Sequence, residues 1–129
     1  MEFLELEEVL RIHARTIEEH GGSHGLRDKG ALESALHAPF NRFNYEDATL
    51  EVCAATYAYH LSQAHAFIDG NKRIAASASV VFLRINGARL KVADKQEFRD
   101  LFLQIASGEM TRDEVEAKFA EWFVEDKKS

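Results

Sequence analysis

Apolar residues recur every three to four positions along most of the chain, as in helices with one buried face, and no long stretch alternates apolar with polar residues. The first helix is predicted over residues 4–20, where Val9, His13 and Ile17 lie on one stripe. Gly21 follows, and it can end the helix because glycine adopts the left-handed backbone conformation found at helix C-termini.

A shorter second helix is predicted over residues 28–38. Asp28 can accept hydrogen bonds from its first backbone N–H groups, and Pro39 interrupts the pattern because proline lacks an N–H group. In residues 40–47, aromatic side chains are spaced among polar ones. This spacing predicts a short flap or hairpin, or equally a loop packed on the surface, between the second and third helices.

Two further helices, predicted over residues 49–64 and 73–86, are apolar on nearly every side, which is typical of helices at the centre of a bundle. Both carry small residues, which allow two helix axes to approach closely. These residues are Ala54, Ala55, Ala58, Ala75, Ala76 and Ala78. We therefore expect the two helices to form the core.

Two pairs of residues with the spacing of capping boxes predict the last two helices: Asp94 with Glu97, and Thr111 with Glu114. The last helix is expected to end in a polar tail over residues 125–129. Its buried residues should be Val115, Phe119, Trp122 and Phe123. The whole pattern predicts an all-α fold, a compact bundle of about six helices in a single domain that covers the 129 residues.

Charge limits the partners that the surface can bind. The chain carries 22 acidic and 16 basic residues, a formal net charge of -6, which disfavours direct binding to nucleic acid. Five basic residues nevertheless lie close together in the sequence and predict a confined anion site. These are Lys72, Arg73, Arg84, Arg89 and Lys91.

No apolar run approaches the ~20 residues needed to span a bilayer, and the acidic N-terminus is unlike a signal peptide. The single cysteine, Cys53, excludes an internal disulfide and is surrounded by small apolar residues typical of a core. We therefore expect a cytoplasmic protein without a membrane partner.

Reactive side chains gather in residues 65–73, between the two apolar helices. Residues 70–73 open the second of these helices, so its unpaired N–H groups and the positive end of its dipole can hold phosphate oxygens. The predicted phosphate-binding residues are Gly70, Asn71, Lys72 and Arg73, of which the last two add positive charge.

Asp69 and His65 complete this segment. A carboxylate beside a phosphate site indicates a divalent cation, and Mg²⁺ commonly takes one or two carboxylates together with phosphate oxygens. The imidazole of His65 can take a proton from a hydroxyl group near neutral pH, which is the role of a general base. Each residue alone also fits an ordinary turn and helix start, so only the ordered combination indicates a site.

This combination resembles the motif of the Fic/Doc superfamily. Residues 65–73 read His-Ala-Phe-Ile-Asp-Gly-Asn-Lys-Arg, similar to H-x-F-x-[D/E/N]-[G/A]-N-[G/K]-R. Lys72 indicates the Doc (death-on-curing) branch, because most Fic proteins have glycine at that position. Residues 21–35 and 82–87 also resemble segments of Doc proteins, so the resemblance spans most of the chain.

The resemblance implies a toxin of a toxin–antitoxin system, which transfers a phosphoryl group from ATP to a serine or threonine hydroxyl of a protein such as elongation factor Tu and arrests growth. Transfer of AMP, as in most Fic proteins, is the alternative. The implied partner is an antitoxin whose disordered tail folds on binding. By matching position, the general base is His65, the Mg²⁺ ligand is Asp69, and the phosphate-binding group is Asn71, Lys72 and Arg73.

Three positions depart from the family pattern. Ala76 replaces the second arginine of a typical Fic motif, and Gln63 replaces an arginine of Doc. Ser77 stands where Doc has asparagine, and we include it among the predicted nucleotide-binding residues. These departures favour a second hypothesis, that the protein is a binding module whose nucleotide site has decayed.

Overall fold

The structure is a computed structural model that describes residues 1–126. Over this range the chain forms six helices and one two-stranded sheet, which confirms the predicted all-α class with about six helices. The helices are α1 (Leu6–His20), α2 (Lys29–Glu46), α3 (Leu50–Ala64), α4 (Asn71–Ile85), α5 (Lys95–Ala106) and α6 (Arg112–Trp122), and the strands are β1 (Ala88–Leu90) and β2 (Phe123–Glu125). No helix within residues 1–126 combines the length and apolar composition needed to cross a membrane.

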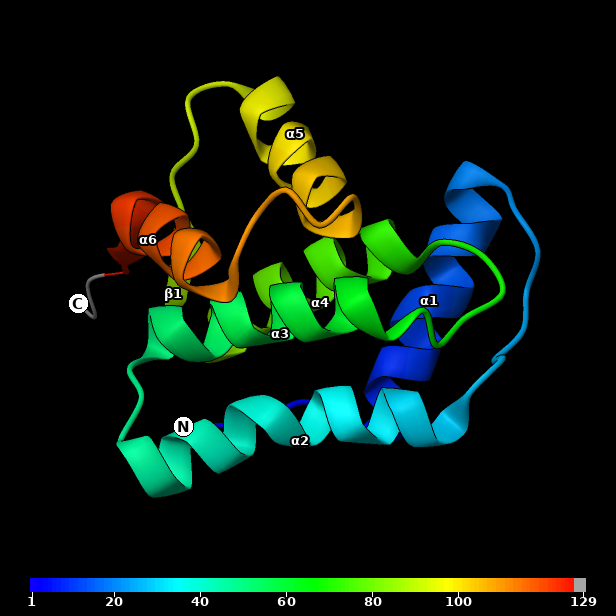
Figure 1. Cartoon of the computed structure of the whole chain (residues 1–129), viewed down its shortest axis with the longest axis horizontal. Coiled ribbons are helices and arrows are strands. Elements are labelled where there is room, and N and C mark those ends of the chain that lie inside the picture. The colour runs from blue at the N-terminus through cyan, green and yellow to red at the C-terminus, as the bar shows by residue number, and fades with distance from the viewer. Residues whose placement is uncertain (127–129) are drawn as a thin grey trace.

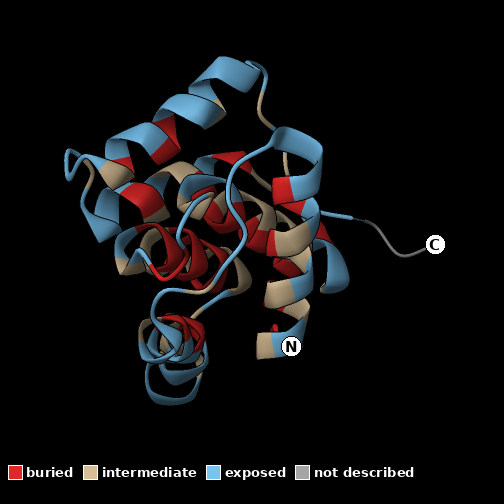
Figure 2. Ribbon diagram, turned by 90° about the vertical axis from the view of Figure 1, so that its right-hand side faces the viewer, coloured by how far each residue is buried: buried red, intermediate tan, exposed pale blue. Residues whose placement is uncertain are grey.

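Helix α3 lies at the centre of the molecule. Figure 1 shows α2 along one side of α3, α4 behind it, and α5 and α6 on the side opposite α2. Ala54 and Ala58 of α3 and Ala75 and Ala78 of α4 are fully buried, and their small side chains let the two helices approach closely. Buried residues concentrate on the inner faces of the helices, whereas the outward faces of the peripheral helices are exposed (Figure 2). The two apolar helices thus form the core, as predicted.

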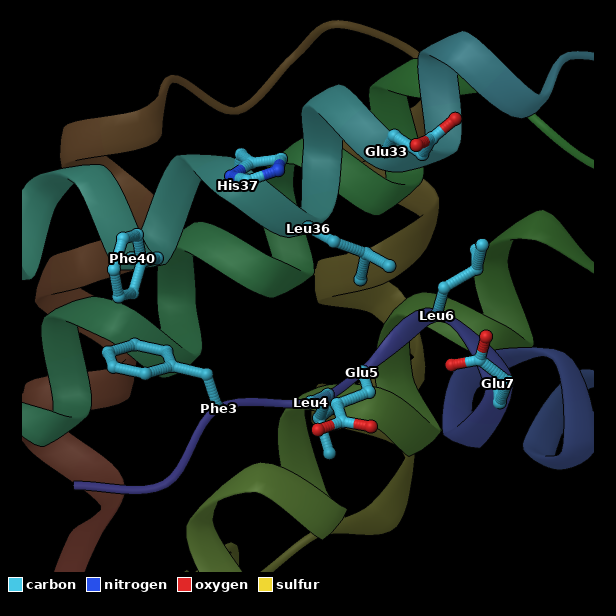
Figure 3. Close-up of a pocket in the computed structure, with 9 residues that line it drawn as sticks. All are labelled: Phe3, Leu4, Glu5, Leu6, Glu7, Glu33, Leu36, His37 and Phe40. Atoms are coloured by element: carbon cyan, nitrogen blue, oxygen red, sulfur yellow. The ribbon is translucent and has the colours of Figure 1, made fainter.

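Helix α2 is longer than the sequence pattern predicts. It continues through Pro39, so the flap or loop predicted over residues 40–47 is wrong, and the chain is helical up to residue 46. The fixed φ of proline is compatible with a helix. Proline inside a helix costs about 3 kcal/mol of stability because a backbone hydrogen bond is lost and the ring crowds the preceding turn. Packing helps to offset this cost, because the rings of Phe40 and Phe3 pack edge to face with centroids 5.4 Å apart (Figure 3).

Arg42 ties the second half of α2 to two other helices. Its guanidinium donates to the hydroxyl of Thr56 on α3 at 3.1 Å and forms an ion pair with Glu116 of α6 at 3.1 Å. Glu46, one turn further along α2, also accepts from it at 3.4 Å. The side chains of Arg42 and Glu116 are only 14% and 16% exposed, so solvent screens their attraction incompletely. These contacts between distant segments keep residues 40–46 helical.

The chain after the last helix forms a strand. β2 pairs antiparallel with β1, with Leu90 opposite Phe123. Phe123, predicted to be buried on the last helix, therefore belongs to β2 and is half-buried. Strands of three residues are too short to show a period of two, which is why the pattern did not reveal them. Residues 127–129 of the predicted tail lie outside the described residues.

The two predicted capping boxes have different outcomes. The box of Thr111 with Glu114 is confirmed: the Thr111 hydroxyl accepts from the Glu114 N–H at 3.2 Å, and the Glu114 carboxylate accepts from the Thr111 N–H at 3.0 Å. The box of Asp94 with Glu97 is not formed. Asp94 still caps α5, but the side chain of Glu97 pairs with Lys118 of α6 at 3.3 Å.

Candidate active site

The loop between α3 and α4, residues 65–70, begins and ends in the left-handed backbone region. His65, which ends α3, has φ +47°, and Gly70, which precedes α4, has φ +76°. Glycine adopts this conformation without strain, whereas a histidine there costs of the order of 1–3 kcal/mol. The side chain of His65 is exposed. The fold therefore holds His65 in a strained turn that keeps its imidazole at the surface.

Asn71 fixes the loop from its C-terminal end. The Asn71 side-chain amide donates to the Phe67 carbonyl at 2.9 Å, and its side-chain oxygen accepts from the Phe67 N–H at 3.1 Å. The ring of Phe67 is buried, as predicted, and stacks on the ring of His13 with centroids 3.7 Å apart. His13 Nε2 also lies 2.7 Å from the Asp69 carbonyl oxygen. The loop is thus anchored to α1 beneath it.

A second loop, residues 21–28 between α1 and α2, lies along the α3–α4 loop (Figure 1). The N–H groups of Arg27 and Asp28 donate to the Ala66 carbonyl at 2.7 and 2.9 Å. In the other direction, the Ile68 N–H donates to the Gly25 carbonyl at 3.1 Å. These backbone hydrogen bonds hold the two loops together in a strand-like pair.

Two contacts of the α1–α2 loop reach the predicted site residues. Arg27 Nη2 donates to the backbone carbonyl of His65 at 2.6 Å, and the Ser23 N–H donates to Asp69 Oδ2 at 3.2 Å. Gly22 passes so close to this carboxylate that a Cβ at position 22 would lie 2.7 Å from Asp69 Oδ2. The loop therefore fixes the backbone at His65 and the side chain of Asp69.

The N-terminus of α4 is open to a ligand. The first hydrogen bond of the helix runs from the Ile74 N–H to the Gly70 carbonyl at 2.9 Å, so the preceding N–H groups of Asn71, Lys72 and Arg73 point out of the helix end. Asn71, Lys72 and Arg73 line a cavity of about 360 Å³, which we call the loop cavity. Its lining is formed by Ser62, His65, Ile68, Asp69, Gly70, Asn71, Lys72, Arg73 and Ala106.

A neighbouring cavity of about 580 Å³ lies between α1, α4 and α5. It is lined by Thr16, His20, Lys72, Arg73, Ala76, Ser77, Phe98, Arg99, Phe102 and Leu103. Lys72 and Arg73 line both cavities, whereas Ser77 lines only this second one. The predicted nucleotide-binding residues are thus divided between the two cavities. The side chain of Asn71 is bonded to the backbone of Phe67, so Asn71 offers a ligand its backbone N–H.

Asp69 suits a metal site that completes its ligand shell with phosphate and water. Its carboxylate is exposed, and each oxygen accepts one backbone N–H, from Gly70 at 3.0 Å and from Ser23 at 3.2 Å. Among the described residues, no three His, Cys, Asp or Glu side chains converge as a metal site. One carboxylate matches Mg²⁺ bound together with a polyphosphate, because Mg²⁺ usually keeps several waters and takes few protein ligands.

The sequence pattern did not reveal the residues that support the loop. His13 and Arg27 contact it from α1 and the α1–α2 loop, and the buried Ser62 lines the loop cavity. Only the family resemblance of residues 21–35 marked the segment that contains Arg27. Gln63 does not line the loop cavity. Its side-chain amide donates to the Ile105 carbonyl, at the end of α5, at 2.7 Å.

An exposed imidazole, a carboxylate and an open helix N-terminus surround one loop of this helical protein, an arrangement that suits an anionic ligand. The chain belongs to the Fic/DOC family, whose sequence model matches residues 3–83. It is 35% identical over 112 residues to the protein kinase doc of Escherichia phage P1, covering 86% of this chain and 87% of that protein. It is 33% identical over 122 residues to the toxin Doc of Mycolicibacterium smegmatis, covering 92% of both chains. Both relatives are Doc proteins, which confirms the branch that Lys72 indicates.

Proposed function

We propose that this protein is a Doc-like toxin that transfers the γ-phosphoryl group of ATP to a serine or threonine hydroxyl of a protein and thereby arrests growth. One observation carries the proposal: the exposed His65 and the open N-terminus of α4 line the same cavity of about 360 Å³. A relative that is named a protein kinase and another that is named a toxin support it.

The chemistry requires placement more than covalent catalysis. The N–H groups at the start of α4, with Lys72 and Arg73, hold the phosphate oxygens and balance their charge. His65 accepts the proton of the incoming hydroxyl. The hydroxyl oxygen forms a bond to the γ-phosphorus while the bond between that phosphorus and the bridging oxygen breaks, and ADP leaves.

Asp69 is the residue that would hold Mg²⁺, and the bound ion would neutralise charge on the polyphosphate. The hydrogen bonds from Ser23 and Gly70 orient the carboxylate for this role. They leave lone pairs on both oxygens, because a carboxylate has about four acceptor sites.

Transfer of AMP is the alternative reaction on the same site. The hydroxyl would then attack the α-phosphorus, and pyrophosphate would leave. The residue at position 76 favours phosphoryl transfer, because Ala76 offers no charge where a typical Fic motif has its second arginine. We therefore expect the γ-phosphoryl group, and not the α-phosphoryl group, to lie next to His65.

The target and the partner follow from the same proposal. We propose elongation factor Tu, a cytoplasmic translation factor, as the protein that receives the phosphoryl group, which makes the cytoplasm the place of action. A cell that makes such a toxin must neutralise it, so we also propose a cognate antitoxin whose disordered tail folds on binding. Co-purification with the product of the neighbouring gene tests this partner, and recovery of the toxin alone would refute it.

The test incubates the protein with elongation factor Tu and ATP labelled at either the γ- or the α-phosphate, followed by mass spectrometry of the factor. We expect transfer of the γ label, its loss in the His65→Ala variant, and its retention in His37→Ala, which changes an exposed histidine on α2. Transfer of the α label would replace the kinase by an AMP transferase. Growth arrest that survives His65→Ala in cells would favour the decayed binding module.

A further inference from the structure

The hydroxyl of Ser62 is buried without a partner. Ser62 lies in the last turn of α3, three residues before His65, and the residue is 1% exposed. Among residues 1–126, its Oγ is one of two buried side-chain polar atoms without a hydrogen-bond partner. The other, Glu116 Oε2, lies 3.6 Å from the guanidinium of Arg112 and is therefore compensated by charge.

The other buried serine and threonine hydroxyl groups among the described residues are satisfied within their own helices. Thr16 donates to the Ile12 carbonyl at 2.9 Å, and Thr56 donates to the Val52 carbonyl at 2.7 Å. Ser79 likewise donates to the Ala76 carbonyl at 2.9 Å. A buried polar group that stays unpaired lowers stability and therefore calls for an explanation. Ser62 differs from these three residues because its hydroxyl has no partner and because it lines the loop cavity.

Ser62 lines the loop cavity, together with His65 and the start of α4. Ala106, at the end of α5, also lines this cavity and has no polar side chain. Ser62 thus brings an unpaired hydroxyl donor to the wall of a cavity in which the cationic side chains of Lys72 and Arg73 attract an anion. A phosphate oxygen is the acceptor that matches this position.

We infer that Ser62 is a nucleotide-binding residue, whose hydroxyl donates a hydrogen bond to an oxygen of the phosphate chain held in the loop cavity. The inference rests on the proposed function, because that function supplies the nucleotide. It adds a contact from α3 to those from α4, so that the phosphate chain is held from both walls of the cavity.

Isothermal titration calorimetry with Mg²⁺ and a non-hydrolysable ATP analogue tests the inference. The Ser62→Ala variant removes the donor, and the Ser79→Ala variant is the matched control, because Ser79 is also buried but is bonded within its own helix. We expect Ser62→Ala to weaken binding by about tenfold, the size expected for one hydrogen bond to a charged group. Ser79→Ala should bind as the unchanged protein does.

Thermal melting separates a role in binding from a role in folding. Ser62→Ala should melt at or above the temperature of the unchanged protein, since it removes an unpaired buried group, whereas Ser79→Ala should melt lower. Unchanged affinity in Ser62→Ala would overturn the inference and leave the proposed function standing. Lower melting of Ser62→Ala together with weaker binding would also overturn it, by assigning a structural role. No binding by the unchanged protein would overturn both proposals.

Discussion

The guanidinium of Arg27 donates a 2.6 Å hydrogen bond to the backbone carbonyl of His65, although 38 residues separate them in the sequence. His65 has the left-handed backbone conformation at this point, which a histidine adopts only under strain. The hydrogen bond therefore stabilises the conformation that keeps the imidazole exposed. Arg27 is a positioning residue, since it acts on the site through the backbone of His65.

Replacing Arg27 with alanine is expected to lower kcat for phosphoryl transfer about 10- to 100-fold, because small displacements of a catalytic group have large effects on rate. The KM for ATP should change little, since most of the proposed phosphate-binding residues lie on α4. Steady-state kinetics measure both constants. Arg27→Lys, which keeps one donor, should recover part of the rate, and Arg11→Ala, exposed on α1, should have none of these effects. A rise in KM at constant kcat would contradict this role.

Gly22 and Gly21 offer a matched pair of substitutions beside Asp69. Both have positive φ, +114° and +84°, so alanine is strained at either position. Only at position 22 would the added Cβ collide with the Asp69 carboxylate, because at position 21 nothing lies within 4 Å. Gly22→Ala should therefore displace Asp69 and raise the Mg²⁺ concentration for half-maximal activity by about tenfold or more.

Titration of activity with Mg²⁺ measures this effect. Gly21→Ala should keep the Mg²⁺ dependence of the unchanged protein while losing comparable stability. Equal half-maximal concentrations in the two variants would show that the Asp69 carboxylate does not control metal binding.

Asn71 is expected to act on the site through Phe67. Asn71→Ala removes both side-chain hydrogen bonds to the backbone of Phe67, which is a buried residue. The free energy of unfolding should fall by about 1–3 kcal/mol, the cost of leaving such groups unpaired. Chemical denaturation measures this loss, and Asn41→Ala, exposed on α2, should change stability little. If Asn71→Ala kept full stability but bound nucleotide more weakly, the Asn71 amide would instead bind the phosphate.

The sequence predicts those parts of the site that depend on local order. The motif in residues 65–73 places an imidazole, a carboxylate and a helix N-terminus within one turn, and the structure brings them to one cavity. Their chemical roles stay predictions. The supports from His13 and Arg27 could not be predicted, because no local pattern specifies which segment will pack against a loop. The position of Ser77 outside the loop cavity could not be predicted either, for the same reason.

The fold shows a similar limit. Helical periodicity revealed the six helices, but the interruption predicted at Pro39 is wrong because local propensity competes with tertiary packing. The ring of Phe3 and the Arg42 contacts with α3 and α6 stabilise the second half of α2. All of these partners are distant in sequence from Pro39, so the residues next to Pro39 do not reveal their effect on the helix.

The stability of the protein is expected to depend on pH through His60, a half-buried histidine of α3. Burial lowers the pKa of His60 from its ordinary value of 6.5, and the positive charges of Arg112 and Arg42 lower it further. The acidic groups of this cluster are Glu116, which pairs with both arginines, and Glu46, which pairs with Arg42. As the pH falls through about 6.5, the unfolded chain takes up a proton at His60 before the folded chain does. Protonation therefore favours unfolding, and the free energy of unfolding should decrease over this range.

Urea denaturation between about pH 5.5 and 8 measures this decrease, in a window above the ordinary pKa of carboxylates. His60→Gln removes the titrating group and should flatten the dependence, because glutamine is neutral throughout. The matched control is His37→Gln, since His37 is exposed and its substitution should leave the slope unchanged. A slope that persists in His60→Gln would assign the pH dependence to another histidine. A stability that rises as the pH falls would contradict the direction of the pKa shift itself.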